Sequence, residues 1–297
     1  MSQLDTDPDL AGSSSAPAQT PPRPFQVRGF GMTDPGRVRP SNEDHFAIVE
    51  LARTLHVHRT SIPQAAAQYS SHRGHVFVVA DGMGGHRGGE VASALTVVTV
   101  ESFLLNSLRR FFHLEAPEEQ HVMKEFRSAL LHADARVFEE AAREPRLAGM
   151  GATLTMAFAV DWTLFVAHAG DCRAYLYSQG ELRQLTSDHT VAAELVRRGD
   201  LSPDAAAGHR FRHVVMNVLG GTQPGARVEL HKLDVEPNDI LLLCSDGLTE
   251  MVKDDRIAAI LGDGSDPKRM CECLVAEANE NGGRDNITAV VGVFAEA

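Results

Sequence analysis

Acidic residues recur where apolar segments of the sequence begin or end, and carboxylates in such places can hold metal ions. Two of these segments end in Asp-Gly pairs, at Asp81-Gly82 and at Asp246-Gly247. The other acidic positions that border apolar segments are Glu43 and Asp44, Asp171, and Asp285. A single Asp-Gly pair after a strand is more typical of a turn. Five acidic sites at strand edges together indicate that these edges converge.

A convergent set of carboxylates needs cations, because two close carboxylates repel by roughly 4 kcal/mol at an effective dielectric constant near 20. Oxygen ligands without histidine or thiolate favour Mg²⁺ or Mn²⁺ over zinc. Glycine after each aspartate permits close backbone approach, and the carbonyl oxygen of Gly82 is a further candidate ligand. Composition alone leaves open whether the acidity serves cation binding or surface solubility.

Two divalent ions about 3.5–4 Å apart form a centre that supports in-line displacement at phosphorus. In such a centre a bridging water becomes the nucleophile, and the ions neutralise charge on the phosphate oxygens. Arg39 lies just before Asn42-Glu43-Asp44 and is a candidate to bind phosphate through its forked guanidinium group. On spacing alone, a surface arginine without such a role is an equal alternative.

The elements that must position these residues follow from the hydrophobic pattern. Residues 76–80 and 240–244 are continuous apolar segments, which favour strands buried on both faces. Residues 154–160 alternate large and small side chains, as in a strand with one face toward a core. Further predicted strands are residues 164–169, 174–177 and 287–294, and predicted helices are residues 90–111, 122–137 and 267–280, the last capped by Asp266. Strands with a few long helices between them predict an α+β sandwich.

The ends of the chain and one internal segment are predicted to lie outside this sandwich. Residues 1–24 are rich in Ser, Ala, Pro and Asp without periodicity, so we expect a disordered tail before a folded part at residues 25–297. Residues 51–74 are polar and irregular, and we interpret them as a surface insertion between two strands.

Composition narrows the class of protein. A formal net charge of -12 over 297 residues argues against a nucleic-acid partner, because the surface would be repelled by phosphates. No apolar segment approaches the length of a membrane-spanning helix, and the first residues lack the features of a signal peptide. The four cysteines are most simply reduced thiols. We therefore expect a soluble cytoplasmic protein.

Six short motifs occur in an order that resembles one family. They are Arg39-Pro-Ser-Asn-Glu-Asp44, Asp81-Gly-Met-Gly-Gly-His86, Gly151-Ala-Thr153, Gly170-Asp-Cys-Arg173, Ser245-Asp-Gly247 and Asp285-Asn286. This order resembles the protein phosphatase 2C family, the metal-dependent Ser/Thr phosphatases, and in particular its bacterial branch. The resemblance covers nearly all of the chain after the tail. It implies a β-sandwich of two antiparallel sheets flanked by helices.

The resemblance also implies roles for individual residues. Asp81 would bridge two Mn²⁺ or Mg²⁺ ions, Gly82 would bind through its carbonyl, Asp246 and Asp285 would bind one ion, and Glu43 would lie near the other. Asp44 would orient water, Asp171 would bind a weaker third ion, and Arg39 would bind phosphate. Residues 186–220 resemble the flap that bacterial members carry beside the active site.

Three departures from the family pattern limit this transfer, and one of them is the insertion at residues 51–74, which has no counterpart in the minimal pattern. Met83 stands where many eukaryotic members have a histidine proposed as the general acid, so that role has no evident owner. Among the 14 histidines, His86 and His189 are the best candidates to replace it, although a structural role is the default for each. Cys172 replaces the usual serine of its motif, a change that we expect to be tolerated.

The expected substrates are phosphorylated proteins in signal transduction, and the resemblance implies a cognate eukaryote-like Ser/Thr kinase and its targets as partners. We expect a monomer. A non-catalytic phosphoprotein-binding module would require loss of a metal aspartate, yet Asp81, Asp246 and Asp285 are all present. A specialised regulator of an anti-anti-sigma-type partner usually carries further domains, which this length does not hold. A metal-binding structural protein would leave Arg39 beside the acids unexplained.

Overall fold

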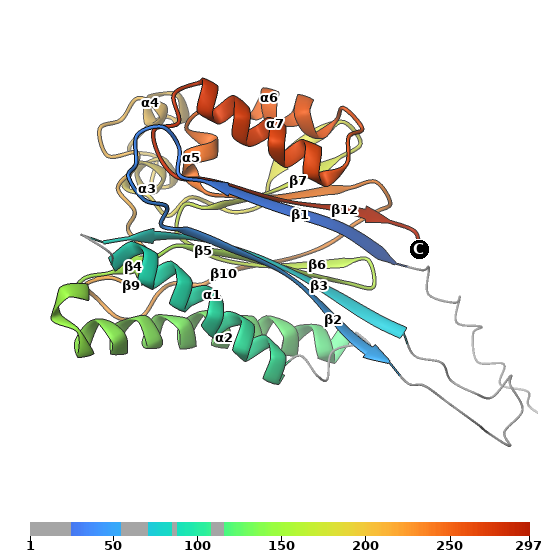
Figure 1. Ribbon diagram of the computed structural model, residues 1–297, viewed down its shortest axis with the longest axis horizontal. Helices are drawn as coiled ribbons and strands as arrows, with labels where there is room; N and C mark the ends of the chain where they lie inside the picture. The colour runs from blue at the N-terminus through green and yellow to red at the C-terminus, as the bar shows by residue number, and fades with distance from the viewer. Residues whose placement is uncertain (1–24, 55–70, 85–87, 108–115) are drawn as a thin grey trace, which may run out of the picture.

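Two β-sheets packed face to face form the centre of the protein, with helices on both outer surfaces (Figure 1). A computed structural model describes residues 25–54, 71–84, 88–107 and 116–297. The predicted tail at residues 1–24 therefore lies outside the described residues. Every strand pair in the described part is antiparallel. This arrangement confirms the predicted sandwich of two antiparallel sheets flanked by helices.

The five-stranded sheet has the strand order β1-β12-β11-β7-β8. Its strands are β1 (Gln26–Asp34), β12 (Ile287–Ala295), β11 (Ile240–Cys244), β7 (Arg173–Ser178) and β8 (Glu181–Gln184). The seven-stranded sheet has the order β10-β6-β5-β3-β4-β9, and β2 pairs with β3. Its strands are β10 (Glu229–Asp234), β6 (Thr163–Ala169), β5 (Leu154–Val160), β3 (Ser71–Met83), β4 (Gly151–Ala152), β9 (Leu219–Gly220) and β2 (Asp44–Thr54).

Long helices cover the outer face of each sheet. Helices α1 (Gly88–Ser107) and α2 (Ala116–Arg143) lie under the seven-stranded sheet, and α6 (Asp254–Leu261) and α7 (Pro267–Glu280) lie over the five-stranded sheet (Figure 1). The remaining helices are short, namely α3 (Val191–Arg197), α4 (Pro203–Ala207), α5 (Asp246–Thr249) and the 3₁₀ turn η3 (Pro145–Leu147). Asp266 caps α7 as predicted, because its side chain accepts a hydrogen bond from Arg269 N at 3.1 Å. None of the described helices is long and apolar enough to cross a membrane.

Strand β5 shows how the layers share the core, and it corrects one expectation. All of its residues are buried, so it does not have the single core-facing side that the sequence predicted. Its large side chains, including Met156 and Phe158, pack toward the helices, whereas Ala157 and Ala159 pack toward the other sheet. Small residues on the inner face allow two sheets to approach each other, and they do not mark an exposed face.

The hairpin of β2 and β3 is longer than the hydrophobic pattern predicted. Pairing runs from Asp44 opposite Asp81 to Thr54 opposite Ser71. Both ends of the segment predicted as an insertion are therefore strand, because ladder pairing satisfies the backbone whatever the polarity of the side chains. Residues 55–70, between these strands, lie outside the described residues.

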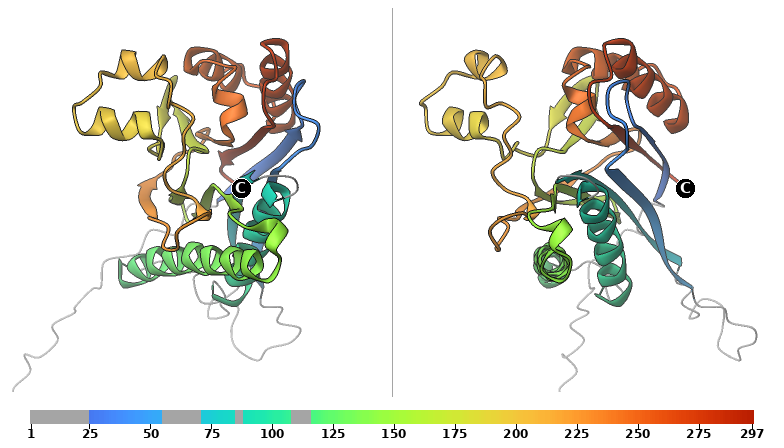
Figure 2. Two further views of the ribbon diagram at one scale, coloured as in Figure 1. Left: turned by 90° about the vertical axis from the view of Figure 1, so that its left-hand side faces the viewer. Right: turned by 60° about the vertical axis from the view of Figure 1, so that its left-hand side comes forward.

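Several strands of both sheets begin or end at one edge of the sandwich. Asp81 is near the end of β3, Asp246 follows β11, Asp285 precedes β12, and Asp171 lies between β6 and β7. Beside this edge, the segment that the sequence identified as a flap carries α3 and α4 and projects from the body of the protein (Figure 2). The bridge between Thr190 and Val215 joins the two ends of that projection.

Candidate active site

A cavity of ≈ 710 Å³, here called the site cavity, opens at this edge. Seven of the residues that the sequence singled out line it: Arg39, Glu43, Asp81, Gly82, Asp171, Asp246 and Asp285. The eighth, Asp44, is buried beside them and is the register partner of Asp81. The structure thus brings all eight predicted site residues into one place.

The β2–β3 hairpin fixes the first part of the site. Antiparallel pairing places Asp44 directly opposite Asp81, and Gly82 N donates a hydrogen bond to Glu43 O at 3.1 Å. A side chain at position 82 would collide with the backbone oxygen of Gly89 at the start of α1. Glycine is required here because strand and helix approach too closely for a Cβ atom.

Asp44 connects the two sheets. Its Oδ2 atom accepts hydrogen bonds from Ser245 Oγ at 2.6 Å and from Thr288 Oγ1 at 2.7 Å. Both donors belong to segments of the five-stranded sheet, whereas Asp44 lies on β2 of the other sheet. Ser245 Oγ in turn accepts a hydrogen bond from Thr288 N at 3.0 Å. No local pattern in the sequence marks either hydroxyl as a partner of Asp44.

Asn286 and Asp285 fix the loop that carries Arg39. The side-chain amide of Asn286 donates to Pro35 O at 3.1 Å and to Ser41 O at 2.9 Å, and its Oδ1 accepts from Glu43 N at 2.8 Å. Arg39 Nη2 lies 2.5 Å from Asp285 Oδ2. This ion pair holds the guanidinium group at the rim of the site cavity, where 54% of its side chain is exposed.

The clustered carboxyl groups resist ionisation. Burial, followed by the charges of Asp44 and Asp246, raises the pKa of Asp81 well above its usual value. Burial, followed by the charge of Asp171, likewise raises the pKa of Asp246 well above its usual value. The pKa of Asp44 is also raised by burial, although the hydrogen bonds from Ser245 and Thr288 oppose this effect. Burial, with the nearby charge of Asp188, raises the pKa of Asp171 to about 7.

Two buried carboxylate oxygens identify what this site is suited to hold. Within the described residues, Asp44 Oδ1 and Asp171 Oδ1 are buried and have no hydrogen-bond partner. A buried carboxylate oxygen without a partner is costly, and a divalent cation satisfies such an oxygen while stabilising the ionised form of its neighbours. Because the donors are carboxylate oxygens, they fit hard ions such as Mg²⁺ and Mn²⁺.

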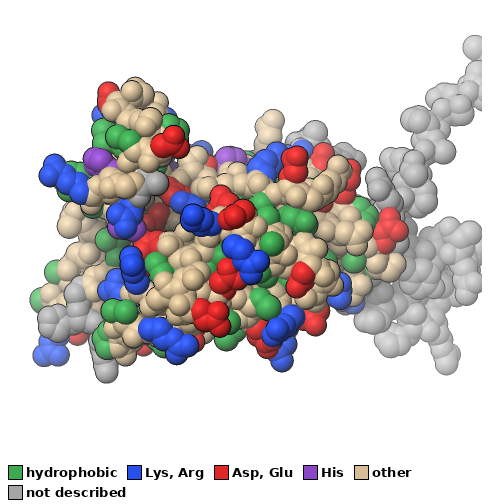
Figure 3. All heavy atoms as spheres, turned by 90° about the horizontal axis from the view of Figure 1, so that it is seen from above, with side chains coloured by type: hydrophobic (Ala, Val, Ile, Leu, Met, Phe, Trp, Pro, Cys, Tyr) green, Lys and Arg blue, Asp and Glu red, His purple; other side chains and the backbone are tan. Residues whose placement is uncertain are grey.

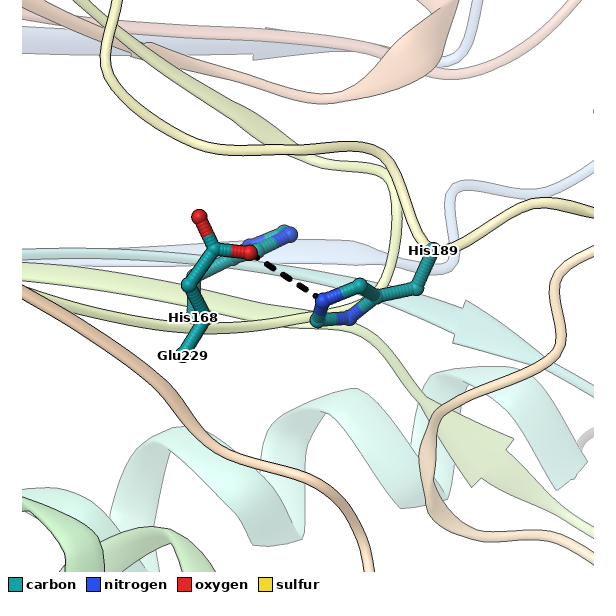
Figure 4. A group of neighbouring side chains, drawn as sticks. All are labelled: His168, His189 and Glu229. Atoms are coloured by element: carbon teal, nitrogen blue, oxygen red, sulfur yellow. Dashed lines mark hydrogen bonds and ion pairs between the residues drawn. The ribbon is translucent and has the colours of Figure 1, made fainter. Parts of the chain in front are cut away.

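A second cluster consists of His168, His189 and Glu229 (Figure 4) and contacts the turn before Asp171 through a hydrogen bond from Gly170 N to His189. His189 Nδ1 accepts hydrogen bonds from Gly170 N at 3.0 Å and from Asn217 Nδ2 at 2.8 Å, so its ring proton lies on Nε2, 3.2 Å from Glu229 Oε2. Burial lowers the pKa of His168 to about 4. Despite burial, hydrogen bonds from His189 and His231 lower the pKa of Glu229 to about 2.

These contacts give His189 a structural role. Its backbone N donates to Gly170 O at 2.7 Å, and its backbone O accepts from Met216 N at 2.8 Å. It therefore ties both ends of the flap to the turn that carries Asp171. The three side chains are close enough together to hold a metal ion. However, the ring nitrogens of His168 and His189 already take part in hydrogen bonds.

We expect His189→Ala to lower the free energy of unfolding by about 2–4 kcal/mol, because buried Gly170 N and the Asn217 amide lose their acceptor. Urea denaturation in the presence of chelator measures this without a contribution from metal. His121→Ala, at an exposed position on α2, is the control and should change the value by less than about 0.5 kcal/mol. Equal effects of the two substitutions would show that the buried network does not anchor the flap.

Other residues at the site were not foreseen. His213 comes from the flap, lines the site cavity and forms a close ion pair with Glu250, which follows α5. Arg284 also lines the cavity. No sequence motif surrounds His213, so only the path of the flap could identify it. Met83 lines the cavity with 41% of its surface exposed, and His86 lies outside the described residues.

Comparison with known proteins agrees with this architecture. The sequence profile of the protein phosphatase 2C family matches residues 54–280. A Ser/Thr phosphatase called stp from Listeria welshimeri is 32% identical over 259 residues, which are 87% of this chain and 92% of that protein. The crystal structure of the Ser/Thr phosphatase PstP/Ppp from Mycobacterium tuberculosis superposes with a TM-score of 0.74 at 29% identity, covering 91% of this chain and 99% of that one. The catalytic domain of PstP in complex with two manganese ions superposes with a TM-score of 0.70 at 29% identity and the same coverage.

The antiparallel sandwich with its carboxylate-lined edge, together with these similarities, assigns the chain to the Ser/Thr protein phosphatases. The chain belongs to the protein phosphatase 2C family, as the order of its motifs predicted. Its similarity to bacterial members extends over almost the whole of the chain.

Proposed function

We propose that this chain hydrolyses phosphoserine and phosphothreonine in proteins with the help of two divalent cations bound at the site cavity. The observation that carries the proposal is the convergence of carboxylates from both sheets, with buried oxygens of Asp44 and Asp171 that lack partners in the described residues. Asp81, Gly82, Asp246, Asp285 and Glu43 would hold the two ions, and Asp171 would hold a third. When bound, such ions neutralise charge on phosphate oxygens and lower the pKa of water.

The residues of the chain itself supply binding and orientation. Arg39, paired with Asp285 at the rim, would donate hydrogen bonds to phosphate oxygens. Asp44 is fixed through Oδ2, which leaves Oδ1 available to accept a hydrogen bond from water. Met83 has no proton to donate, so it cannot protonate the serine or threonine oxygen that leaves.

Arg39→Ala should raise KM for a phosphopeptide about tenfold and change kcat much less, because a guanidinium group binds phosphate in both the ground state and the transition state. Steady-state kinetics with a phosphothreonine peptide measures both constants. Arg37→Ala is the matched control, because Arg37 is an exposed arginine two residues away that does not line the cavity. If KM and kcat both stayed at their wild-type values in Arg39→Ala, the assigned phosphate contact would be wrong.

The proposed reaction is tested with purified protein and peptides that contain phosphoserine, phosphothreonine or phosphotyrosine. We expect release of phosphate from the first two with Mn²⁺ or Mg²⁺, and none after exhaustive chelation. Hydrolysis that persisted at full rate in chelator would exclude the two-metal reaction. The alternative, a non-catalytic phosphoprotein-binding module, would bind these peptides without releasing phosphate.

We further propose that a cognate eukaryote-like Ser/Thr kinase supplies the substrates, and that the chain acts as a monomer in the cytoplasm. The four cysteines are all free thiols, and three of them are buried. Free cysteines are usual in a reducing compartment, which supports the cytoplasmic location.

A further inference from the structure

A second cavity, of ≈ 550 Å³, lies between the flap and the body of the protein and is here called the flap cavity. It adjoins the site cavity, since both are lined by Asp171, His213, Asp246, Glu250 and Arg284. An extended polypeptide advances about 3.3 Å per residue. When a phosphorylated side chain occupies the site cavity, residues a few positions away in the same substrate can therefore reach the flap cavity.

The part of the flap cavity wall that α3 and α4 form is apolar and made of small side chains. Ala193 and Val196 come from α3, and Pro203 and Ala206 come from α4. Both short helices are capped by hydroxyl side chains, since Thr190 accepts from Ala193 N and Ser202 accepts from Ala205 N, each at 3.3 Å. This wall can accommodate the aliphatic part of a substrate side chain without a steric clash.

The charges around the flap cavity differ in whether they are already paired. Asp188 is bonded to Arg173 through two contacts of 2.8 and 2.7 Å, and Glu250 pairs with His213. Asp171 and Asp246 belong to the carboxylate cluster described above. Arg212 and Arg284 also line this cavity, and neither forms an ion pair within the described residues.

Other surface charges are mixed in sign. Acidic and basic side chains are interspersed over the face seen from above (Figure 3). A general positive charge therefore does not distinguish the flap cavity from the rest of the surface. The distinguishing feature of the flap cavity is a pair of arginines without carboxylate partners in the described residues, next to an apolar wall and joined to the site cavity.

We propose that the flap cavity binds the substrate segment beside the phosphorylated residue and selects an acidic side chain there through Arg212 and Arg284. The methylene groups of a substrate glutamate would lie against the wall formed by α3 and α4, and its carboxylate would face the two arginines. This inference rests on the proposed function and adds a substrate class to it, namely phosphoproteins with glutamate or aspartate near the phosphorylated serine or threonine.

The test uses the full chain with Mn²⁺ and phosphothreonine peptides in which one glutamate is moved through the flanking positions. Each peptide is paired with a version that has glutamine at the same position. At one or more positions, kcat/KM should be about two- to fivefold higher with glutamate, the range expected of an exposed ion pair. In Arg212→Gln and Arg284→Gln this ratio should fall toward one. The ratio does not depend on how much of a variant is correctly folded.

Two further variants make the result decisive. Arg212→Glu should reverse the preference, so that lysine peptides are hydrolysed faster than glutamate peptides. Arg28→Gln, at an exposed arginine on β1 that lines neither cavity, should retain the wild-type ratio. Hydrolysis without any flanking preference, or a preference unchanged in all arginine variants, would overturn the inference and leave the proposed function intact. If no peptide is hydrolysed with metal present, both are overturned.

Discussion

Asp81→Asn is expected to reduce kcat for phosphopeptides on the order of 10³-fold or more while the fold persists. Asp81 lies among the clustered carboxylates, since its pKa responds to four other aspartates, Asp44, Asp246, Asp171 and Asp285. A residue so placed can contact more than one cation, and loss of metal chemistry removes several kcal/mol of transition-state stabilisation.

The same substitution has an expected effect on stability that a damaged core would not produce. Asparagine has nearly the shape of aspartate but no charge, so it relieves repulsion among the remaining carboxylates. In chelator, the melting temperature of Asp81→Asn should therefore equal or exceed that of the wild type, and the increase on adding Mn²⁺ should shrink. Asp255→Asn, at an exposed position on α6, is the control for both readouts. A variant that kept wild-type kcat would show that Asp81 is not a metal ligand.

The metal-free protein should lose stability as the pH rises from about 4 toward 7. Most proteins instead gain stability as the pH rises out of the acid range. Burial, with the nearby charge of Asp188, raises the pKa of Asp171 to about 7, and the pKa values of Asp81 and Asp246 are also raised. A carboxyl group with a raised pKa in the folded state binds more protons there than in the unfolded chain. The stability that such a group contributes is fully present below its pKa in the unfolded chain, 3.8, and is lost as the pH rises through its pKa in the folded protein.

Metal should remove this dependence, because cations stabilise the ionised carboxylates that the folded protein otherwise resists. Thermal unfolding measured in chelator should thus show a melting temperature that falls between pH 4.5 and 7.5. The free energy of unfolding should decrease by up to about 1.4 kcal/mol per pH unit for each group that titrates. With saturating Mn²⁺ the melting temperature near neutral pH should rise. A flat profile in chelator together with no response to Mn²⁺ would contradict the assigned cluster.

The metal-binding edge could be predicted from the sequence because its signals are local. Asp81 and Asp246 each follow a continuous apolar strand and precede glycine, and such strands must end at the surface of a buried sheet. Helix α7 could be placed for the same kind of reason, since Asp266 and Pro267 mark its first turn. In each case the few residues around the position contain the information.

Contacts between distant segments could not be predicted in this way. The hydrogen bonds from Ser245 and Thr288 to Asp44 join residues 201 and 244 positions apart. They depend on how two sheets pack, which no local pattern specifies. The inner face of β5 differs from its prediction for a related reason, because Ala157 and Ala159 face another sheet and not solvent.

The flap residues have the weakest signals in the local sequence. His213 reaches the site cavity only because the segment with α3 and α4 projects and returns beside Glu250. Nothing in its sequence neighbours distinguishes it among the 14 histidines of the chain. His189, in contrast, lies beside a motif, which makes it a candidate for acid catalysis by position, yet its ring forms hydrogen bonds with Gly170, Asn217 and Glu229.

Anomalous diffraction at the manganese absorption edge, from crystals of the full chain grown with Mn²⁺, tests the two-metal centre most directly. We expect at least two peaks in the site cavity, each in contact with Asp81. Asp246 should lie beside one of these peaks and Glu43 beside the other. Crystals of Asp81→Asn grown in the same way should lose these peaks. An absence of manganese from the site cavity of the wild type, or a single peak at His168, His189 and Glu229, would contradict the account.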